Sequence, residues 1–173
     1  AGGEQAGAGK DARDAVVILW GLSQQPPRAT FARNRLSRLP VRSAVATAVG
    51  DLDGDGHADL AVAVHRGAET FNGTSRAWLG DGQRKFVEIK RGFSTSGTTG
   101  VAIAPATKAD GRARVVFCNS IGGRYDEAVP VHVYWGSRKG FDPKRVWKIP
   151  FQSGYEATAA DLDADGYVDL VLL

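Results

Sequence analysis

The sequence predicts an all-β protein in which a unit of four short strands is repeated. Two acidic segments with the same spacing of aspartates, residues 51–59 and 161–169, lie 110 residues apart. Each is followed by a short apolar run, residues 60–64 and 170–173. Segments of β-branched and aromatic residues bounded by Gly, Asp and Asn are typical of strands, and the 22 glycines interrupt any helical pattern. Matching copies along one chain indicate a repeat protein.

The repeat interval is 55 residues, because a degenerate copy lies midway between the two acidic segments. Residues 105–119 align with residues 50–64, so that Asp110-Gly111 falls under Asp55-Gly56 and an apolar run again follows. One set of aromatic residues keeps the same interval: Phe31, Phe86 and Phe141. The chain therefore contains at least two full periods.

Each period is predicted to hold four strands. In the first, they cover residues 45–49, 60–64, 75–79 and 86–90, and a Gly-rich turn separates the last two. Four strands in about 55 residues are typical of a propeller blade. The small residues before the acidic loop fit a crowded innermost strand. We interpret Ser94–Gly100 as a linker between blades.

These strands divide the chain into a short leader and a series of blades. Residues 1–15 are Gly/Ala-rich and are predicted to be a flexible leader or loop, whereas residues 16–173 form β-propeller blades. The predicted parts are an outer half blade (16–40), two blades (41–95 and 96–150) and an inner half blade (151–173). Known propellers have four to eight blades, so about three cannot readily close a ring. We expect a fragment of a longer chain; the alternative is that copies associate through open blade edges, residues 168–173 of one pairing with 16–20 of another.

The spacing of aspartates predicts a metal site in each acidic loop. Carboxylates at alternate positions, then a glycine and a last carboxylate, can form a shell of hard oxygens, which suits calcium. Four carboxylates within about 6 Å repel by ~0.7 kcal/mol per pair even in bulk water, and a dication removes that penalty. Magnesium fits less well because it dehydrates reluctantly. A plain Asp/Gly turn is the alternative, but two complete matches in register favour calcium.

Two segments carry a family resemblance: residues 45–64 read VATAVGDLDGDGHADLAVAV and residues 157–173 read ATAADLDADGYVDLVLL. They resemble FG-GAP/VCBS repeats, the blades of integrin-alpha-like propellers. The resemblance implies a seven-bladed ring, often extracytoplasmic, that serves adhesion, glycan binding or scaffolding. It also implies calcium ligands from side chains at loop positions 1, 3, 5 and 9 and from a backbone carbonyl at position 7. On this chain those positions are Asp51, Asp53, Asp55, His57 and Asp59 in loop one, and Asp161, Asp163, Asp165, Tyr167 and Asp169 in loop two.

The middle copy departs from the family pattern. Ala106, Lys108 and Arg114 stand where loop one has Asp51, Asp53 and Asp59, and only Asp110 remains. We therefore expect no metal there, and we hypothesise that Lys108 or Arg114 neutralises Asp110. Because one blade manages without the ion, calcium is expected to be structural and not a reaction centre.

No catalytic motif is visible, so we expect a non-enzyme. The three histidines and the single cysteine form no H-E-x-x-H, CxxC or Ser-His-Asp pattern. Two residues are candidate ligand contacts: Trp147, which can stack on a sugar, and Glu156, a carboxylate near the propeller axis. Their alternatives are packing between blades for Trp147 and a solvated strand end for Glu156. Asn72-Gly73-Thr74 matches a glycosylation sequon, and the sequence leaves its use open.

Composition narrows the partners. Apolar residues make up 43% and charged residues 24%, and no apolar run reaches the length of a membrane span. The net charge of +3 comes from mostly dispersed basic residues, so we expect no nucleic-acid partner. One local basic cluster is interpreted as a solvated loop and strand edge, with polyanion binding or a protein contact as the alternatives: Arg28, Arg33, Arg35, Arg38 and Arg42.

The sequence therefore predicts a calcium-stabilised propeller scaffold that binds a protein or a glycan. The expected location is extracellular, at the cell surface or periplasmic. One alternative is the propeller part of a polysaccharide lyase or hydrolase. Another is a structural module that closes its ring by self-association.

Overall fold

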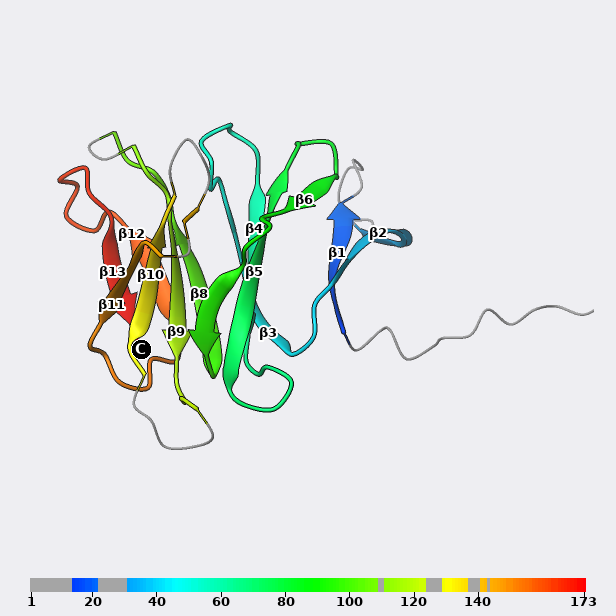
Figure 1. The fold of residues 1–173 in the computed structure, drawn as a ribbon. Helices are drawn as coiled ribbons and strands as arrows, with labels where there is room; N and C mark the ends of the chain where they lie inside the picture. The colour runs from blue at the N-terminus through cyan, green and yellow to red at the C-terminus, as the bar shows by residue number, and fades with distance from the viewer. Residues whose placement is uncertain (1–13, 22–30, 109–110, 124–128, 137–140, 143) are drawn as a thin grey trace, which may run out of the picture. The chain divides into compact units, whose positions relative to one another are not determined.

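The computed structural model describes residues 14–21, 31–108, 111–123, 129–136, 141–142 and 144–173, whose regular elements are all β-strands (Figure 1). The chain divides into two compact units, Ala1–Ala44 and Val45–Leu173. The predicted leader lies outside the described residues as far as residue 13, as does Arg28 of the basic cluster. The described residues include no helix long and apolar enough to cross a membrane.

The first unit contains one antiparallel hairpin. Strands β1 (Ala15–Gly21) and β2 (Phe31–Pro40) pair with Val16 opposite Leu39 and Ile18 opposite Ser37. The indole Nε1 of Trp20 donates a hydrogen bond to the Ser37 hydroxyl at 3.0 Å. Beside the open end of the hairpin, the Val41 N–H donates to the Asp14 carbonyl at 2.9 Å.

The second unit begins with blade 1, in which four strands pair in chain order. They are β3 (Ala44–Gly50), β4 (Asp59–Val64), β5 (Asn72–Gly80) and β6 (Phe86–Glu88). All four predicted strands are present, although β6 ends at Glu88 and not at Lys90. Strand β4 is buried along its whole length, as its unbroken apolar run predicts.

The interpretation of Ser94–Gly100 as a linker is wrong. Phe93–Ser96 forms strand β7, which pairs with the first half of β5, and Thr98 already begins the next strand. Apart from the exposed Ser94 and the half-buried Thr99, this hydroxyl-rich segment is buried, and its polar groups have internal partners: Thr95 shares a 2.8 Å hydrogen bond with Ser75. Such partners lie far away in sequence, so composition alone favours a solvated loop.

Blade 2 repeats the arrangement, and a further hairpin follows it. Blade 2 contains β8 (Thr98–Ala104), β9 (Arg114–Asn119), β10 (Val131–Trp135) and β11 (Val146–Ile149). This hairpin, called the third hairpin from here on, contains β12 (Ala157–Ala160) and β13 (Asp169–Leu172). Figure 1 shows the β3–β4, β8–β9 and β12–β13 turns at the same edge of this unit. The all-β fold with consecutive four-stranded antiparallel blades is confirmed.

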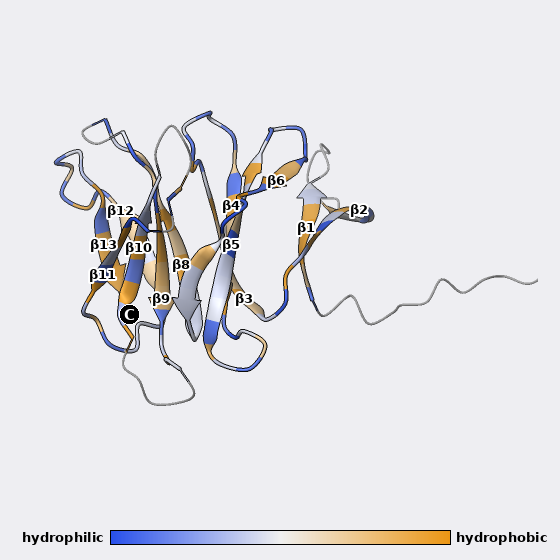
Figure 2. Cartoon of the chain, viewed as in Figure 1, coloured by the Kyte–Doolittle hydropathy of each residue, from blue (hydrophilic) through white to orange (hydrophobic). Residues whose placement is uncertain are grey.

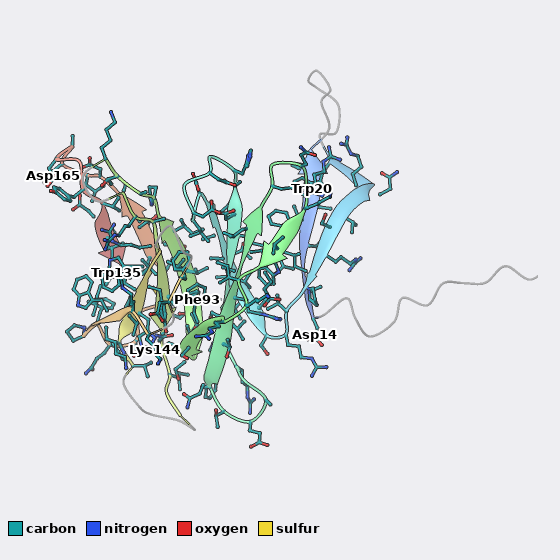
Figure 3. The ribbon with its side chains drawn as sticks, turned by 45° about the horizontal axis from the view of Figure 1, so that its top comes forward. Asp14, Trp20, Phe93, Trp135, Lys144 and Asp165 are labelled. Atoms are coloured by element: carbon teal, nitrogen blue, oxygen red, sulfur yellow. The ribbon has the colours of Figure 1, made fainter. Side chains whose placement is uncertain are left out.

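A core of apolar side chains lies between blades 1 and 2. Phe93 of β7 contacts three aromatic rings of blade 2, with centroid distances of 5.2 Å to Phe117, 5.0 Å to Tyr134 and 5.5 Å to Phe141. Figure 3 shows Phe93 at this interface, and Figure 2 shows that hydrophilic residues predominate in the loops at both ends of the strands. A second cluster, including Val116, Cys118 and Ala157, joins blade 2 to the third hairpin. Packing between successive blades therefore holds this unit together.

Candidate metal centres

Loop one, residues 51–59, brings three carboxylates together. One oxygen each of Asp51, Asp53 and Asp59 lies within 4.8 Å of the others. Asp51 directly follows β3 and Asp59 begins β4, so the pairing of these two strands fixes the first and last carboxylates. At this spacing, three ionised groups repel by about 0.9 kcal/mol or more per pair even in bulk water. The arrangement can therefore hold a metal ion.

Backbone amide groups shape loop one around Asp51. The Gly54 N–H donates to Oδ1 of Asp51 at 2.7 Å, and the Gly56 N–H donates to Oδ2 at 2.9 Å. Both glycines have φ of 85°, a left-handed conformation in which other residues are strained. The two glycines thus let the chain curl until its amides point at the first aspartate.

Asp59 is the buried member of loop one. Asp59 is only 1% exposed. Its Oδ2 accepts a hydrogen bond from the N–H of Leu52 at 2.6 Å, and its Oδ1 accepts one from the N–H of Gly80 at 2.7 Å. Burial raises the pKa of Asp59, the two hydrogen bonds oppose that rise, and the charges of Asp53 and Asp55 add to it. A nearby cation would favour the ionised form.

Loop two, residues 161–169, reproduces this geometry in a more exposed setting. One oxygen each of Asp161, Asp163 and Asp169 lies within 4.8 Å of the others. The Gly166 N–H donates to Asp161 at 3.0 Å, and the Leu162 N–H donates to Asp169 at 2.8 Å. These bonds match those of Gly56 and Leu52 in loop one.

The remaining predicted ligands lie outside the three-carboxylate groups. Asp55 and Asp165 each accept the N–H two residues onward, from His57 at 2.7 Å and from Tyr167 at 2.8 Å (Figure 3 labels Asp165). The His57 ring lies against Gly82 of the β5–β6 turn, where an added Cβ would be 2.6 Å from Nδ1. These aspartates and the carbonyls of His57 and Tyr167 stay predicted ligands.

The middle loop uses a different hydrogen bond in place of the missing aspartate. Arg114 begins β9 where Asp59 begins β4, and the Gly136 N–H donates to the Ala113 carbonyl at 2.9 Å. The N–H of Gly136 therefore donates to a backbone carbonyl, whereas the N–H of the equivalent Gly80 donates to the carboxylate of Asp59. The sequence signal for this contact is that Gly80 and Gly136 each precede one of the repeated phenylalanines, Phe86 and Phe141. The predicted ion pair with Asp110 falls outside the described residues.

The two candidate ligand contacts lie apart from each other. Trp147 is on β11 and is 53% exposed, whereas Glu156 lies beside Gly100 of β8, whose added Cβ would be 2.9 Å from the Glu156 Cα. Strands β11 and β8 are the opposite edges of the blade 2 sheet. The structure therefore does not bring Trp147 and Glu156 into one site.

Comparison with protein families identifies part of the chain. Residues 43–79 match the model of the FG-GAP repeat, which covers β3, loop one, β4 and nearly all of β5. The resemblance to this family is confirmed over that segment. Clusters of aspartates such as those of loops one and two are typical of FG-GAP calcium sites. A comparison with curated proteins finds no match to the chain.

Proposed function

Because residues 43–79 are an FG-GAP repeat, we propose that this protein is a calcium-stabilised, non-catalytic propeller scaffold that binds a protein or a glycan outside the cytoplasm. The observation that carries the proposal is the pair of three-carboxylate groups in loops one and two, shaped by equivalent hydrogen bonds. Each group joins two neighbouring strands of one sheet, so an ion there would hold the strand ends together.

The donor set supports calcium as the ion. Calcium binds six to eight oxygens at about 2.3–2.6 Å, and the oxygens of each group, all within 4.8 Å of one another, are close enough to share one ion. Magnesium binds at about 2.1 Å and keeps several waters, and it suits a cage of protein oxygens less well. Asp51, Asp53 and Asp59 would hold one ion, and Asp161, Asp163 and Asp169 the other.

A structural role for calcium fits the place of these loops. The carboxylates of both loops accept hydrogen bonds from backbone amides of the same turns, so an ion bound to these carboxylates would further order the turns. Exposed calcium sites of extracellular modules bind at about 10⁻⁴–10⁻³ M, a concentration found outside the cytoplasm. This supports an extracellular, cell-surface or periplasmic location.

The exposed indole of Trp147 supports a glycan among the binding partners. It is 53% exposed on an edge strand, where an aromatic face can stack on a sugar ring. A glycan array probed with wild type and with Trp147→Ala tests this role. Loss of binding in a folded variant supports it, and unchanged binding contradicts it.

Release of reducing ends from a bound polysaccharide would instead support the lyase or hydrolase alternative, and a defined oligomer in solution would support self-association through blade edges.

The central experiment is thermal unfolding with millimolar calcium and with a chelator. We expect calcium to raise the Tm of the wild type, because a ligand that binds only the native state stabilises it by mass action. The double variant Asp53→Ala with Asp163→Ala is expected to lose this rise. An identical Tm in all conditions would contradict the calcium role and leave the loops as acidic turns.

A further inference from the structure

We propose that calcium in loop one strengthens the contact between blades 1 and 2, and that Leu52 transmits this effect; the inference rests on the proposed calcium role. Leu52 follows the first aspartate of loop one and is only 3% exposed. It belongs to the cluster that contains Phe93 of blade 1 and Phe117 and Tyr134 of blade 2. A residue of the metal loop is thus part of the core between blades.

Both chain neighbours of Asp51 press against blade 2. A Cβ added to Gly50 would be 2.8 Å from Cγ2 of Ile103 on β8. On the other side of Asp51, the Leu52 carbonyl lies 3.3 Å from the place of a Cβ on Gly136. The backbone on either side of the first ligand therefore touches blade 2, and a change in its position changes this contact.

Leu52 is also hydrogen-bonded to Asp59, the last predicted metal ligand of loop one. The Leu52 N–H donates to Oδ2 of Asp59 at 2.6 Å, and Oδ1 of Asp59 accepts the Gly80 N–H of β5. An ion that draws Asp51 and Asp59 together fixes Leu52 from both sides. Because the interior between blades is close-packed, a fixed Leu52 keeps its contacts while a mobile one loses them.

Loop two provides an internal comparison. Its equivalent leucine, Leu162, makes the same backbone bond to Asp169 but is 65% exposed. Ala160, which precedes Asp161 as Gly50 precedes Asp51, is also exposed. In this chain, loop two therefore has the metal-binding pattern without the buried leucine, and the coupling is assigned to loop one alone.

The coupling is reciprocal, so a change in blade 2 must alter calcium binding in loop one. The test begins from the full chain carrying Asp161→Ala and Asp163→Ala, in which calcium titration reports loop one. Gly136→Ala is added to this background because its Cβ would meet Cζ of Phe141 at 3.1 Å and the carbonyls of Leu52 and Ala113 at 3.3 Å, so it disturbs the contact from the blade 2 side without replacing any residue of loop one. Leu52→Ala is the second variant.

We expect each added change to weaken calcium binding, measured by calorimetry, by at least about fivefold, the lower range of allosteric coupling. Calcium should also slow amide exchange in residues 131–136, and Leu52→Ala should abolish that effect. Val133→Ala controls for destabilisation of blade 2, because Val133 is buried in the cluster facing the third hairpin. It should change affinity less than about twofold, a change well below the coupling range. Should Leu52→Ala fail to fold, Gly136→Ala still decides the question.

The matched control uses loop two. In a chain carrying Asp51→Ala and Asp53→Ala, Leu162→Ala should leave calcium affinity within about twofold, again below the coupling range. The coupling is refuted, and the scaffold proposal stands, if loop one binds calcium with the same affinity in three proteins: the Asp161→Ala, Asp163→Ala parent, and this parent carrying either Leu52→Ala or Gly136→Ala. If neither loop of the unmodified protein binds calcium, both proposals are refuted.

Discussion

The carboxylate of Asp59 and the backbone N–H of Gly80, 21 residues apart in sequence, are joined by a 2.7 Å hydrogen bond inside blade 1. This bond ties the last predicted metal ligand to the end of β5. Blade 2 makes the equivalent connection without a carboxylate, from the Gly136 N–H to the Ala113 carbonyl. Asp59 therefore has a structural role that does not depend on an ion.

We predict that Asp59→Ala destabilises the protein even in a chelator. The change leaves the N–H groups of Leu52 and Gly80 without their acceptor, and each buried unsatisfied donor costs about 1–3 kcal/mol, so the free energy of unfolding should fall by about 2–6 kcal/mol. Asp169→Ala is the control, because Asp169 is half-buried and accepts the Leu162 N–H. It should cost about 1 kcal/mol or less. Equal losses for both variants in urea unfolding would contradict the role of burial.

The fourth position of the two loops should respond in opposite directions to exchange of alanine and glycine. Ala164 has φ of 61° in loop two, whereas the equivalent Gly54 has φ of 85° in loop one. A left-handed conformation strains a residue with a Cβ, so Ala164→Gly should stabilise and Gly54→Ala destabilise, each by about 1 kcal/mol. No atom lies within 4 Å of a Cβ added to Gly54, so strain alone decides. Urea unfolding in a chelator measures both; a stabilising Gly54→Ala would overturn this explanation.

His132 should make stability fall below neutral pH. Burial lowers its pKa, the charge of Lys148 lowers it further, and its hydrogen-bond partner, the Ser94 carbonyl, opposes the shift. The folded-state pKa lies below the unfolded value of 6.5, so this contribution to stability is present above pH 6.5. It is lost as pH falls from there through the folded-state pKa, because the unfolded chain takes up the proton first.

His132→Gln tests that dependence. We expect the difference in unfolding free energy between pH 7.5 and pH 5 to be smaller in the variant than in the wild type, with both in a chelator. Carboxylates titrate in both proteins and cancel in the comparison. Parallel pH profiles would show that His132 does not contribute.

Tyr134 should contribute through its hydroxyl as well as its ring. The O–H donates to the Ser94 carbonyl at 2.6 Å and so connects β10 of blade 2 with β7 of blade 1. Tyr134→Phe should keep the ring packing and lower the unfolding free energy by about 1 kcal/mol. Burial raises the pKa of Tyr134 to about 12, so an ultraviolet titration should show a late-ionising tyrosine that the variant lacks. If the variant instead lacks a tyrosine that ionises at the ordinary pKa of about 10, the assignment is refuted.

Much of the fold was predictable because it depends on local patterns. Strand β4 and its counterparts are apolar runs that follow a turn of Asp and Gly, and such turns restrict where a strand can begin. The spacing of Asp51, Asp53 and Asp59 likewise predicts their approach, since one short turn holds all three. The 55-residue interval then extends the blade pattern to the degenerate middle copy.

Other features could not be predicted from local sequence. Strand β7 resembles a loop in composition, and only its pairing with β5 and the Ser75–Thr95 bond explain its burial. The bond from Gly136 to Ala113 substitutes for a side chain that the middle repeat lacks. Each depends on groups brought together from distant parts of the chain.

By itself, the sequence determined the repeat, the strand order within a blade and the two aspartate loops, because turn chemistry and alternation act over a few residues. Tertiary structure alone decided that Leu52 is buried while its equivalent Leu162 is exposed. Both leucines occupy the same place in the same motif. Their difference arises because blade 2 packs against loop one, and burial depends on neighbours that local sequence does not specify.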